Sequence, residues 1–99
     1  MSTSKSNATV PMIVSIRDSK GEVLQGATTS DTSVTVEGRS KSGTNVEVFD
    51  GTISKGNVLA GPTGQWLMEL GGLALGGHSI TARVDGSVSV PRTFSVVQQ

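Results

Sequence analysis

Histidine and carboxylate side chains are the groups of this chain that could do chemistry, and they are few. His78 is the only histidine in 99 residues, and the chain contains no cysteine. A general base, a catalytic triad or a histidine-ligated metal would therefore have to use His78. The sequence Gly77-His78-Ser79-Ile80 places it at the start of a strand, on the side that faces the core. We expect an imidazole that hydrogen-bonds nearby backbone and closes the end of a sheet.

Asp18, Glu22 and Asp31 could bring carboxylates to one end of the fold. Calcium takes about six to eight oxygen ligands, usually from several acidic side chains that lie close together. The segment DSKGE at residues 18–22 does not match an EF-hand loop, and Lys20 stands in its middle. We therefore expect a solvated turn, with no metal ligand and no cofactor in this chain. A calcium ion shared with a neighbouring repeat stays open as an alternative, since half of its ligands would come from outside the chain.

Two further patterns resemble binding sites. The pairs Gly71-Gly72 and Gly76-Gly77 lack the following helix and the G-K-[ST] motif of a phosphate-binding loop, so we assign them to turns. A sugar-stacking platform needs exposed aromatic rings, and the chain has only Phe49, Trp66 and Phe94. Phe49 alone has the outward parity in its strand, so it is the candidate for such a platform.

Composition and charge exclude several classes of function. One histidine, no cysteine and widely spaced carboxylates leave too few groups for an active site, so we expect no catalysis. Eight basic residues balance eight acidic ones. Nucleic acids and anionic membranes attract a basic patch, and no such patch is visible. No run approaches the roughly 18 apolar residues of a transmembrane helix, so we expect no membrane insertion.

Short alternating segments indicate strands throughout the chain. Polar and apolar residues alternate, and turn signals recur about every 8–12 residues, which is typical of an antiparallel sandwich or barrel. We predict an all-β fold, an antiparallel β-sandwich of about seven to nine short strands. Trp66 stands in the strand that we expect the others to pack around. The predicted core is Val34, Val36, Val46, Val48, Trp66, Met68, Ile80, Ala82, Val84 and Phe94.

Other segments complete this prediction. Met12, Val14 and Ile16 should share one face of the first strand, and Val88, Val90 and Val96 should add to the core. Lys55-Gly56-Asn57 should form a tight turn between two short strands. The apolar segment at residues 73–77 should plug one end of the fold. Asp50-Gly51 and Asp85-Gly86 should close hairpins.

The domain organisation follows from composition. Residues 1–10 are rich in serine and threonine and lack the apolar region of a signal peptide, so we interpret them as a flexible leader or linker. Residues 11–99 should form one domain, since a chain of this length supports a single core.

Four motifs, in order, resemble bacterial immunoglobulin-like repeats, which occur in tandem in large secreted adhesins and other surface proteins. They are SVTVEG at 33–38, GTNVEVFDG at 43–51, GQW at 64–66 and LGGHSITA at 75–82. The corresponding family patterns are T-L-x-G, V-x-V-Y-D-G, G-x-W and L-x-x-G-x-H-x-I-T-A. The likeness spans residues 12 to 97, although Phe49 stands where tyrosine is common and Gly61-Pro62-Thr63 replaces a more acidic turn.

This resemblance implies a seven-stranded immunoglobulin-like sandwich that serves as a spacer or binding module. We accordingly expect a non-catalytic structural or adhesion domain of a larger bacterial protein, located at the cell surface or outside the cell. Its partners would be neighbouring domains of the same polypeptide and a host or surface glycan or protein. One alternative is a carbohydrate- or ligand-binding module attached to an enzyme. Another is a self-contained cytosolic or phage-structural β domain.

Overall fold

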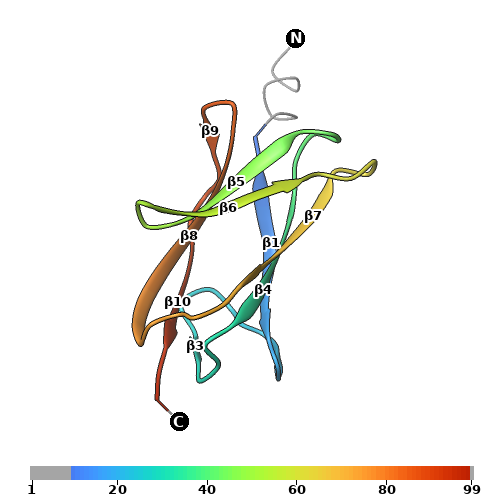
Figure 1. Ribbon diagram of the computed structural model, residues 1–99. Coiled ribbons are helices and arrows are strands. Elements are labelled where there is room, and N and C mark those ends of the chain that lie inside the picture. The colour runs from blue at the N-terminus through green and yellow to red at the C-terminus, as the bar shows by residue number, and fades with distance from the viewer. Residues whose placement is uncertain (1–9, 99) are drawn as a thin grey trace.

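The computed structural model describes residues 10–98 as two β-sheets packed against each other (Figure 1). One sheet has the strand order β2-β1-β4-β7, and the other has the order β3-β10-β8-β5-β6 with β9 paired to β8. The strands are β1 (Met12–Asp18), β2 (Gly21–Glu22), β3 (Thr28–Thr29), β4 (Val34–Arg39), β5 (Asn45–Asp50), β6 (Ile53–Leu59), β7 (Gln65–Leu70), β8 (Gly76–Val84), β9 (Ser87–Val88) and β10 (Arg92–Val96).

The predicted all-β sandwich is confirmed. Within residues 10–98 the structure has ten strands and no helix, against the seven to nine strands expected, and three of the ten are two residues long. Every pairing is antiparallel except that of β3 with β10. Of the leader predicted at residues 1–10, residues 1–9 lie outside the described residues.

The core lies between the sheets and is built by period-2 alternation. In β4, Val34 and Val36 are buried, and in β5, Val46 and Val48 are buried in the same way. Of the ten predicted core residues, nine are buried, whereas Met68 is partly exposed and packs against the others. The core also includes Ile16, Val23, Ala60, Leu70, Leu73 and Val96.

Trp66 determines the packing near the start of β7. Trp66 is 2% exposed, and its register partner in the β4–β7 pair is Gly38 of β4. A side chain at Gly38 would collide with the indole ring of Trp66 and with the Met12 carbonyl oxygen. The absence of a side chain at this position therefore lets the largest side chain of the core lie across the neighbouring strand.

The prediction that Met12, Val14 and Ile16 share one face of β1 is wrong. Met12 and Val14 are exposed, Ile16 is fully buried, and Ile13 packs against the core. The cause is a bulge in the pairing of β1 with β4 between Ile13 and Ser15. One extra residue exchanges the inward and outward faces on the two sides of a bulge, so a simple alternation cannot describe the whole strand.

Two other expectations are also wrong. Lys55-Gly56-Asn57 is not a turn, because β6 runs without interruption from residue 53 to residue 59 and pairs with β5 across a bulge. Val88 and Val90 are 46% and 84% exposed and add nothing to the core, whereas Val96 is buried as predicted. Val90 precedes Pro91 between β9 and β10, where no strand pairing fixes its side chain.

The predicted hairpins are confirmed, whereas the predicted end plug at residues 73–77 is correct only for Leu73, because residues 74–77 are exposed and β8 begins at Gly76. Asp50-Gly51 joins β5 to β6, and Asp85-Gly86 joins β8 to β9. Asp85 and Gly86 both have positive φ, at 49° and 87°, as a type I′ turn requires. Leu73 from the loop between β7 and β8 is 4% exposed and closes one end of the core.

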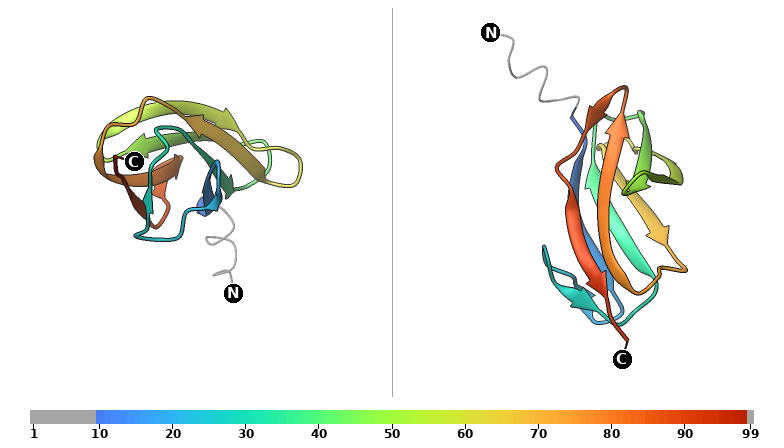
Figure 2. Two further views of the ribbon diagram at one scale, coloured as in Figure 1. Left: turned by 90° about the horizontal axis from the view of Figure 1, so that it is seen from below. Right: turned by 90° about the vertical axis from the view of Figure 1, so that its left-hand side faces the viewer.

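The domain is elongated, with extents of 49 × 22 × 21 Å. The described chain enters β1 at one end of the long axis and leaves β10 at the other end (Figures 1 and 2). β1 and β10 run in the same direction along this axis, and they belong to different sheets.

Candidate functional site

His78 lies in a polar cluster with Asp50 and Ala74 and stacks on the ring of Phe94. The imidazole Nδ1 lies 2.6 Å from Asp50 Oδ2, and Nε2 lies 2.8 Å from the Ala74 carbonyl oxygen. The ring stacks on Phe94, with centroids 5.4 Å apart and planes 24° apart. His78 is the register partner of Phe94 across the β8–β10 ladder, and only 10% of its side chain is exposed.

The partners of His78 determine its preferred protonation state. A carbonyl oxygen only accepts hydrogen bonds, and so does an ionised carboxylate. The imidazole can satisfy both Ala74 and Asp50 only when both of its nitrogens carry a proton, which is the imidazolium form. Asp50 is itself fixed by the backbone amide of Ser79, which donates to Oδ1 at 3.3 Å.

The pKa of His78 is raised above its ordinary value. Burial of the ring acts to lower the pKa, but the hydrogen bond to Ala74 and the hydrogen bond and charge of Asp50 together outweigh it. The charge of Lys55 also lowers the pKa. A catalytic base needs a free nitrogen within reach of a substrate, and in this arrangement both nitrogens contact the protein itself.

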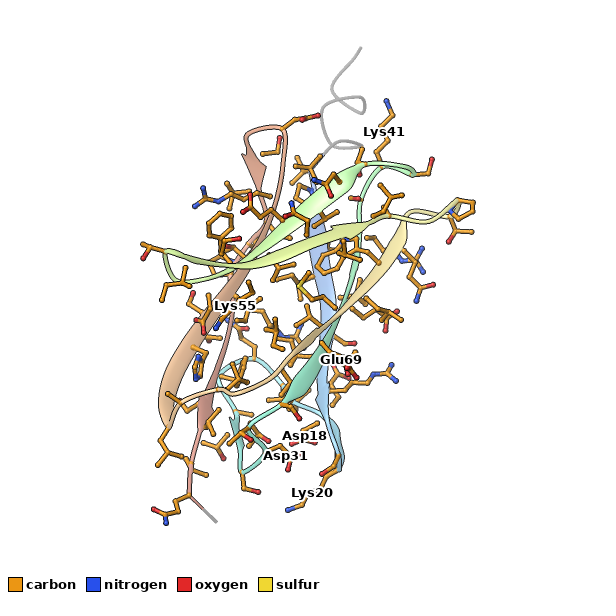
Figure 3. All side chains as sticks on the ribbon, viewed as in Figure 1. Asp18, Lys20, Asp31, Lys41, Lys55 and Glu69 are labelled. Carbon is orange, nitrogen blue, oxygen red and sulfur yellow. The ribbon has the colours of Figure 1, made fainter. Side chains whose placement is uncertain are left out.

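Asp18 and Asp31 meet at one end of the molecule, as the sequence suggested, beside Lys20 (Figure 3). Asp18 accepts from the Thr29 hydroxyl at 2.6 Å and the Lys20 amide at 2.9 Å, and Asp31 accepts from the Ser19 amide at 2.7 Å. These hydrogen bonds lower the pKa of both carboxyl groups. The two carboxylates therefore tie the β1–β2 turn to the chain that follows β3.

Glu22 does not join this pair. Its carboxylate lies 3.1 Å from Arg92 Nη2, and Arg92 also donates to the carbonyl oxygens of Val14 at 3.4 Å and Val23 at 3.5 Å. Arg92 thus connects β10 of one sheet to β1 and β2 of the other. Among residues 10–98, no group of three or more histidine, aspartate or glutamate side chains lies close enough to hold a metal ion.

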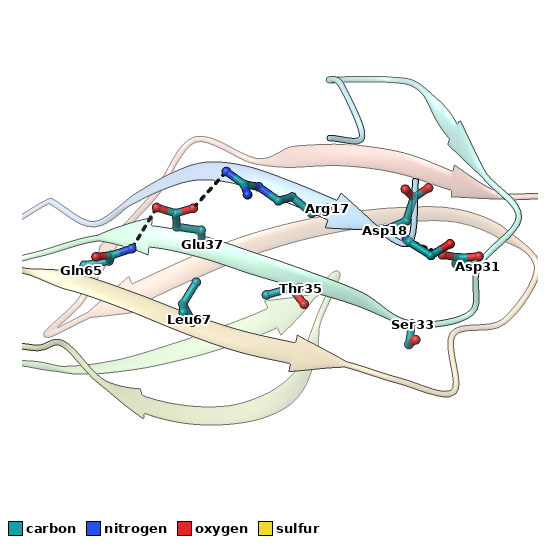
Figure 4. Close-up of a pocket in the computed structure, with 9 residues that line it drawn as sticks. Arg17, Asp18, Asp31, Ser33, Thr35, Glu37, Gln65 and Leu67 are labelled. Atoms are coloured by element: carbon teal, nitrogen blue, oxygen red, sulfur yellow. Dashed lines mark hydrogen bonds and ion pairs between the residues drawn. The ribbon is translucent and has the colours of Figure 1, made fainter. Parts of the chain in front are cut away.

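A shallow groove of about 540 Å³ runs along the outer face of β1, β4 and β7 (Figure 4). Towards one end of the groove, Glu37 lies between Arg17 and Gln65: it accepts from Gln65 Nε2 at 3.0 Å and lies 3.7 Å from Arg17 Nη2. The groove is lined by hydroxyl, amide and charged groups, and its apolar residue is the exposed Leu67. Such a surface offers hydrogen bonds to a polar ligand but no aromatic ring for stacking.

Phe49 has the outward orientation predicted for a stacking platform, but its ring face is covered. The guanidinium carbon of Arg83 lies 4.1 Å from the centre of the ring. This cation–π contact occupies the surface on which a sugar would stack. Trp66 and Phe94 are each 2% exposed and offer no platform. Of the glycine pairs, Gly72 has a positive φ in the loop between β7 and β8, as expected for a turn. The turn predicted at Gly76-Gly77 is wrong, because both residues belong to β8.

The sequence predicted that His78 hydrogen-bonds nearby backbone, as it does with Ala74. It did not identify Asp50, which together with Ala74 determines the charge of His78. Asp50 lies 28 residues away in the chain and was interpreted only as a hairpin residue. The groove around Glu37 and the link through Arg92 were also missed, because both depend on how strands distant in sequence are arranged. The D-G signal after β5 could have placed Asp50 at a strand end, but not beside His78.

Comparisons with known proteins return no relative, since no family model, no curated protein and no solved structure matches the chain. Within residues 10–98, no helix is long and apolar enough to cross a membrane. The likeness to immunoglobulin-like repeats therefore depends on the four sequence motifs, and the two-sheet all-β fold agrees with them.

Proposed function

We propose that this domain is a non-catalytic, immunoglobulin-like structural module that acts as a spacer between neighbouring parts of one polypeptide. The observation that supports it most directly is that the start of β1 and the end of β10 lie at opposite ends of the elongated sandwich (Figure 1). Segments attached there would be held apart by the length of the domain. On the basis of the resemblance to adhesin repeats, the proposed location is a bacterial cell surface or the space outside the cell, beside other domains of the same chain.

The chemistry of the candidate groups supports a passive role. Both nitrogens of His78 contact protein atoms, and Asp18 and Asp31 accept hydrogen bonds that close turns. The space between the sheets is filled by side chains such as Trp66 and Ile80, both of which are buried. These groups have structural partners, which favours a spacer over an enzyme.

Strand direction also supports a role in bearing tension. Pulling the two chain ends apart would load β1 and β10 along their own lengths. The hydrogen bonds of an antiparallel ladder lie across the strands, so this load would shear several of them at once. β1 has five register partners in β4, and β10 has five in β8. A spacer under tension gains from this arrangement, because no terminal strand is peeled off one bond at a time.

A two-copy chain tests the spacer proposal. If two copies of residues 1–99 are joined in tandem, small-angle X-ray scattering should give a maximum dimension larger than that of one copy by roughly the 49 Å length of the domain. The single copy is the control. An increase close to the 22 Å width would mean that the copies pack side by side, and it would contradict a spacer.

A second candidate function is that of a carbohydrate- or ligand-binding accessory module, and the groove around Glu37 favours it. The spacer proposal predicts that a glycan array and a panel of common metabolites give no ligand tighter than about millimolar, near −4 kcal/mol. A micromolar ligand whose NMR shift changes map to Arg17, Thr35 and Gln65 would favour the binding module. Changes at unrelated positions would place the site elsewhere.

A further inference from the structure

The loop at residues 71–75 is held over the end of the core at two neighbouring points. The Leu73 amide donates to the Thr32 carbonyl oxygen at 2.9 Å, and the Leu73 side chain is buried. The Ala74 carbonyl oxygen receives the His78 Nε2 hydrogen bond at 2.8 Å. The next residue, Leu75, is 60% exposed. Of the two polar anchors, only the one at Ala74 involves a group that titrates near neutral pH.

Loss of the imidazolium proton cannot leave both bonds of His78 intact. The neutral ring has one N–H, so one of its nitrogens would present a lone pair to an acceptor less than 3 Å away. The bond to Asp50 is charge-assisted and therefore the stronger one. Asp50 belongs to β5, which pairs with strands on both sides, whereas Ala74 belongs to a loop. The bond to Ala74 should therefore break first.

We propose that His78, Asp50 and Ala74 form a protonation-dependent latch, which fixes the loop at residues 71–75 when His78 is an imidazolium and releases it when His78 is neutral. Release breaks the Nε2–Ala74 bond and leaves the Nδ1–Asp50 bond in place. The loop is then held at Leu73 alone, so the buried Leu73 side chain and the end of the core become accessible more often. The rest of the sandwich keeps its packing, because its core consists of apolar side chains.

The charged groups around His78 set the pH at which the latch acts. Asp50 faces it from β5 and favours the imidazolium, whereas Lys55 of β6 opposes it. β10 contributes the uncharged ring of Phe94, and the loop contributes the Ala74 carbonyl. The raised pKa of His78 places release above the ordinary histidine value of about 6.5.

Nuclear magnetic resonance of the full 99-residue chain tests the latch without any substitution. Imidazole nitrogen shifts report the protonation of His78 between about pH 5 and about pH 9, a range that spans the ordinary pKa of about 6.5. Amide exchange, corrected for its intrinsic pH dependence, reports the opening of the loop at Leu73. The Ser40 amide, which donates to the Gly64 carbonyl oxygen at 2.8 Å, is the control.

The latch predicts that both ring nitrogens are protonated at low pH. Protection of the Leu73 amide should fall about tenfold through the His78 midpoint, as expected for losing one charge-assisted hydrogen bond. Protection of the Ser40 amide should stay constant. Unchanged Leu73 protection, or an equal loss at Ser40, would overturn the proposal, because the first excludes loop release and the second indicates global unfolding.

Two carboxylate variants separate the latch from general charge effects. Asp50→Asn removes the anion beside His78, so the His78 midpoint and the onset of Leu73 exchange should both move to lower pH. Glu47→Gln is the matched control, since Glu47 lies in the same strand and accepts from the Ser54 hydroxyl at 2.6 Å. If Glu47→Gln moves the midpoint as far as Asp50→Asn does, Asp50 is not the partner that sets it.

Discussion

The two ends of the core are closed in different ways. At the start of β7, Trp66 lies across Gly38, and its buried indole Nε1 has no hydrogen-bond partner among residues 10–98. At the start of β8, His78 makes hydrogen bonds with both nitrogens and stacks on Phe94. One end is held by apolar packing strong enough to tolerate an unmade hydrogen bond, a deficit of about 1–3 kcal/mol. At the other end, one hydrogen bond of the closing loop, that of His78 to Ala74, depends on a single proton.

Because of this difference, the stability of the Trp66 end should not depend on pH, whereas the loop at the His78 end should respond to pH. Apolar packing has no titratable group, so the Trp66 end should be equally stable across the neutral pH range. At the His78 end, the hydrogen bond to Ala74 contributes stability only while the imidazolium persists. A domain built this way keeps its fold as pH changes while one loop responds. The predictions below test that contrast at each end.

The largest effect is expected from Trp66→Ala. Emptying a large aromatic site in a core costs roughly 3–5 kcal/mol, a large part of the total for a small domain. Urea unfolding should show this loss, and its size should not change between pH 6 and pH 8, a range on the order of one unit about neutrality. A loss below about 1 kcal/mol, or native fluorescence resembling free tryptophan, would contradict the assignment of Trp66 to the core.

Gly38→Ala should give the next largest effect. The added methyl collides with the Trp66 ring, so the ring or the strand must shift, at a cost of about 1–3 kcal/mol for overpacking. Gly71→Ala is the matched control, because its added methyl meets no atom within 4 Å and its φ is not positive. Equal losses in the two variants would show that Gly38 contributes only backbone freedom.

His78→Gln should cost less, and its cost should depend on pH. A group with a raised pKa in the folded state binds its proton more tightly there, so its stabilisation is complete below the unfolded value of about 6.5. It is lost as pH rises through the folded value. The variant should lose about 1–2 kcal/mol in acid and progressively less in alkali, measured by urea unfolding at each pH. A loss that grows with pH would reverse the assigned charge state.

The stability that Asp18 and Asp31 contribute should have the opposite pH dependence to that of His78. Their lowered pKa values mean that the stability they add is present above the unfolded value of about 3.9 and is lost as pH falls through the folded values. Asp18→Asn and Asp31→Asn remove that stability at neutral pH, so each should shift the acid-unfolding midpoint to higher pH and flatten the transition. Variants that unfold in acid just as the native chain does would show that these turns add no stability.

The smallest effect is expected from calcium. Because Glu22 pairs with Arg92, only Asp18 and Asp31 of the three suggested carboxylates lie together, and both already accept hydrogen bonds. Ligand binding raises stability by mass action, so melting temperatures in calcium and in chelator should agree closely. A rise of several degrees with calcium would contradict this for the single domain.

Alternation in the sequence predicted the centre of the fold and failed at its margins. Val34, Val36 and Val48 lie in strands with regular pairing, so period 2 identified their inward faces correctly. In β1 the bulge reverses the pattern, and near Val90 no pairing imposes one. Neither bulges nor unpaired chain leave a signal in polarity alone, since both depend on the partner strand.

The candidate site was less predictable than the fold. The position of His78 at a strand start indicated its structural role, because alternation and a glycine-rich turn are local signals. Its charge depends on Asp50 and Ala74, which only the arrangement of β5 and the β7–β8 loop brings to the ring. The contact of Arg83 with Phe49 likewise joins residues 34 positions apart, and it removed the predicted stacking platform.

Single-molecule stretching tests the spacer proposal most directly. The chain has no cysteine, so attachment points can be introduced at its ends or, as a control, at Asn45 and Leu59, which pair across β5 and β6. Pulling the ends shears β1 and β10, whereas pulling the control pair opens the β5–β6 ladder one bond at a time. The spacer proposal predicts a higher unfolding force through the ends than through the control pair. An equal or lower force through the ends would contradict a role in bearing tension.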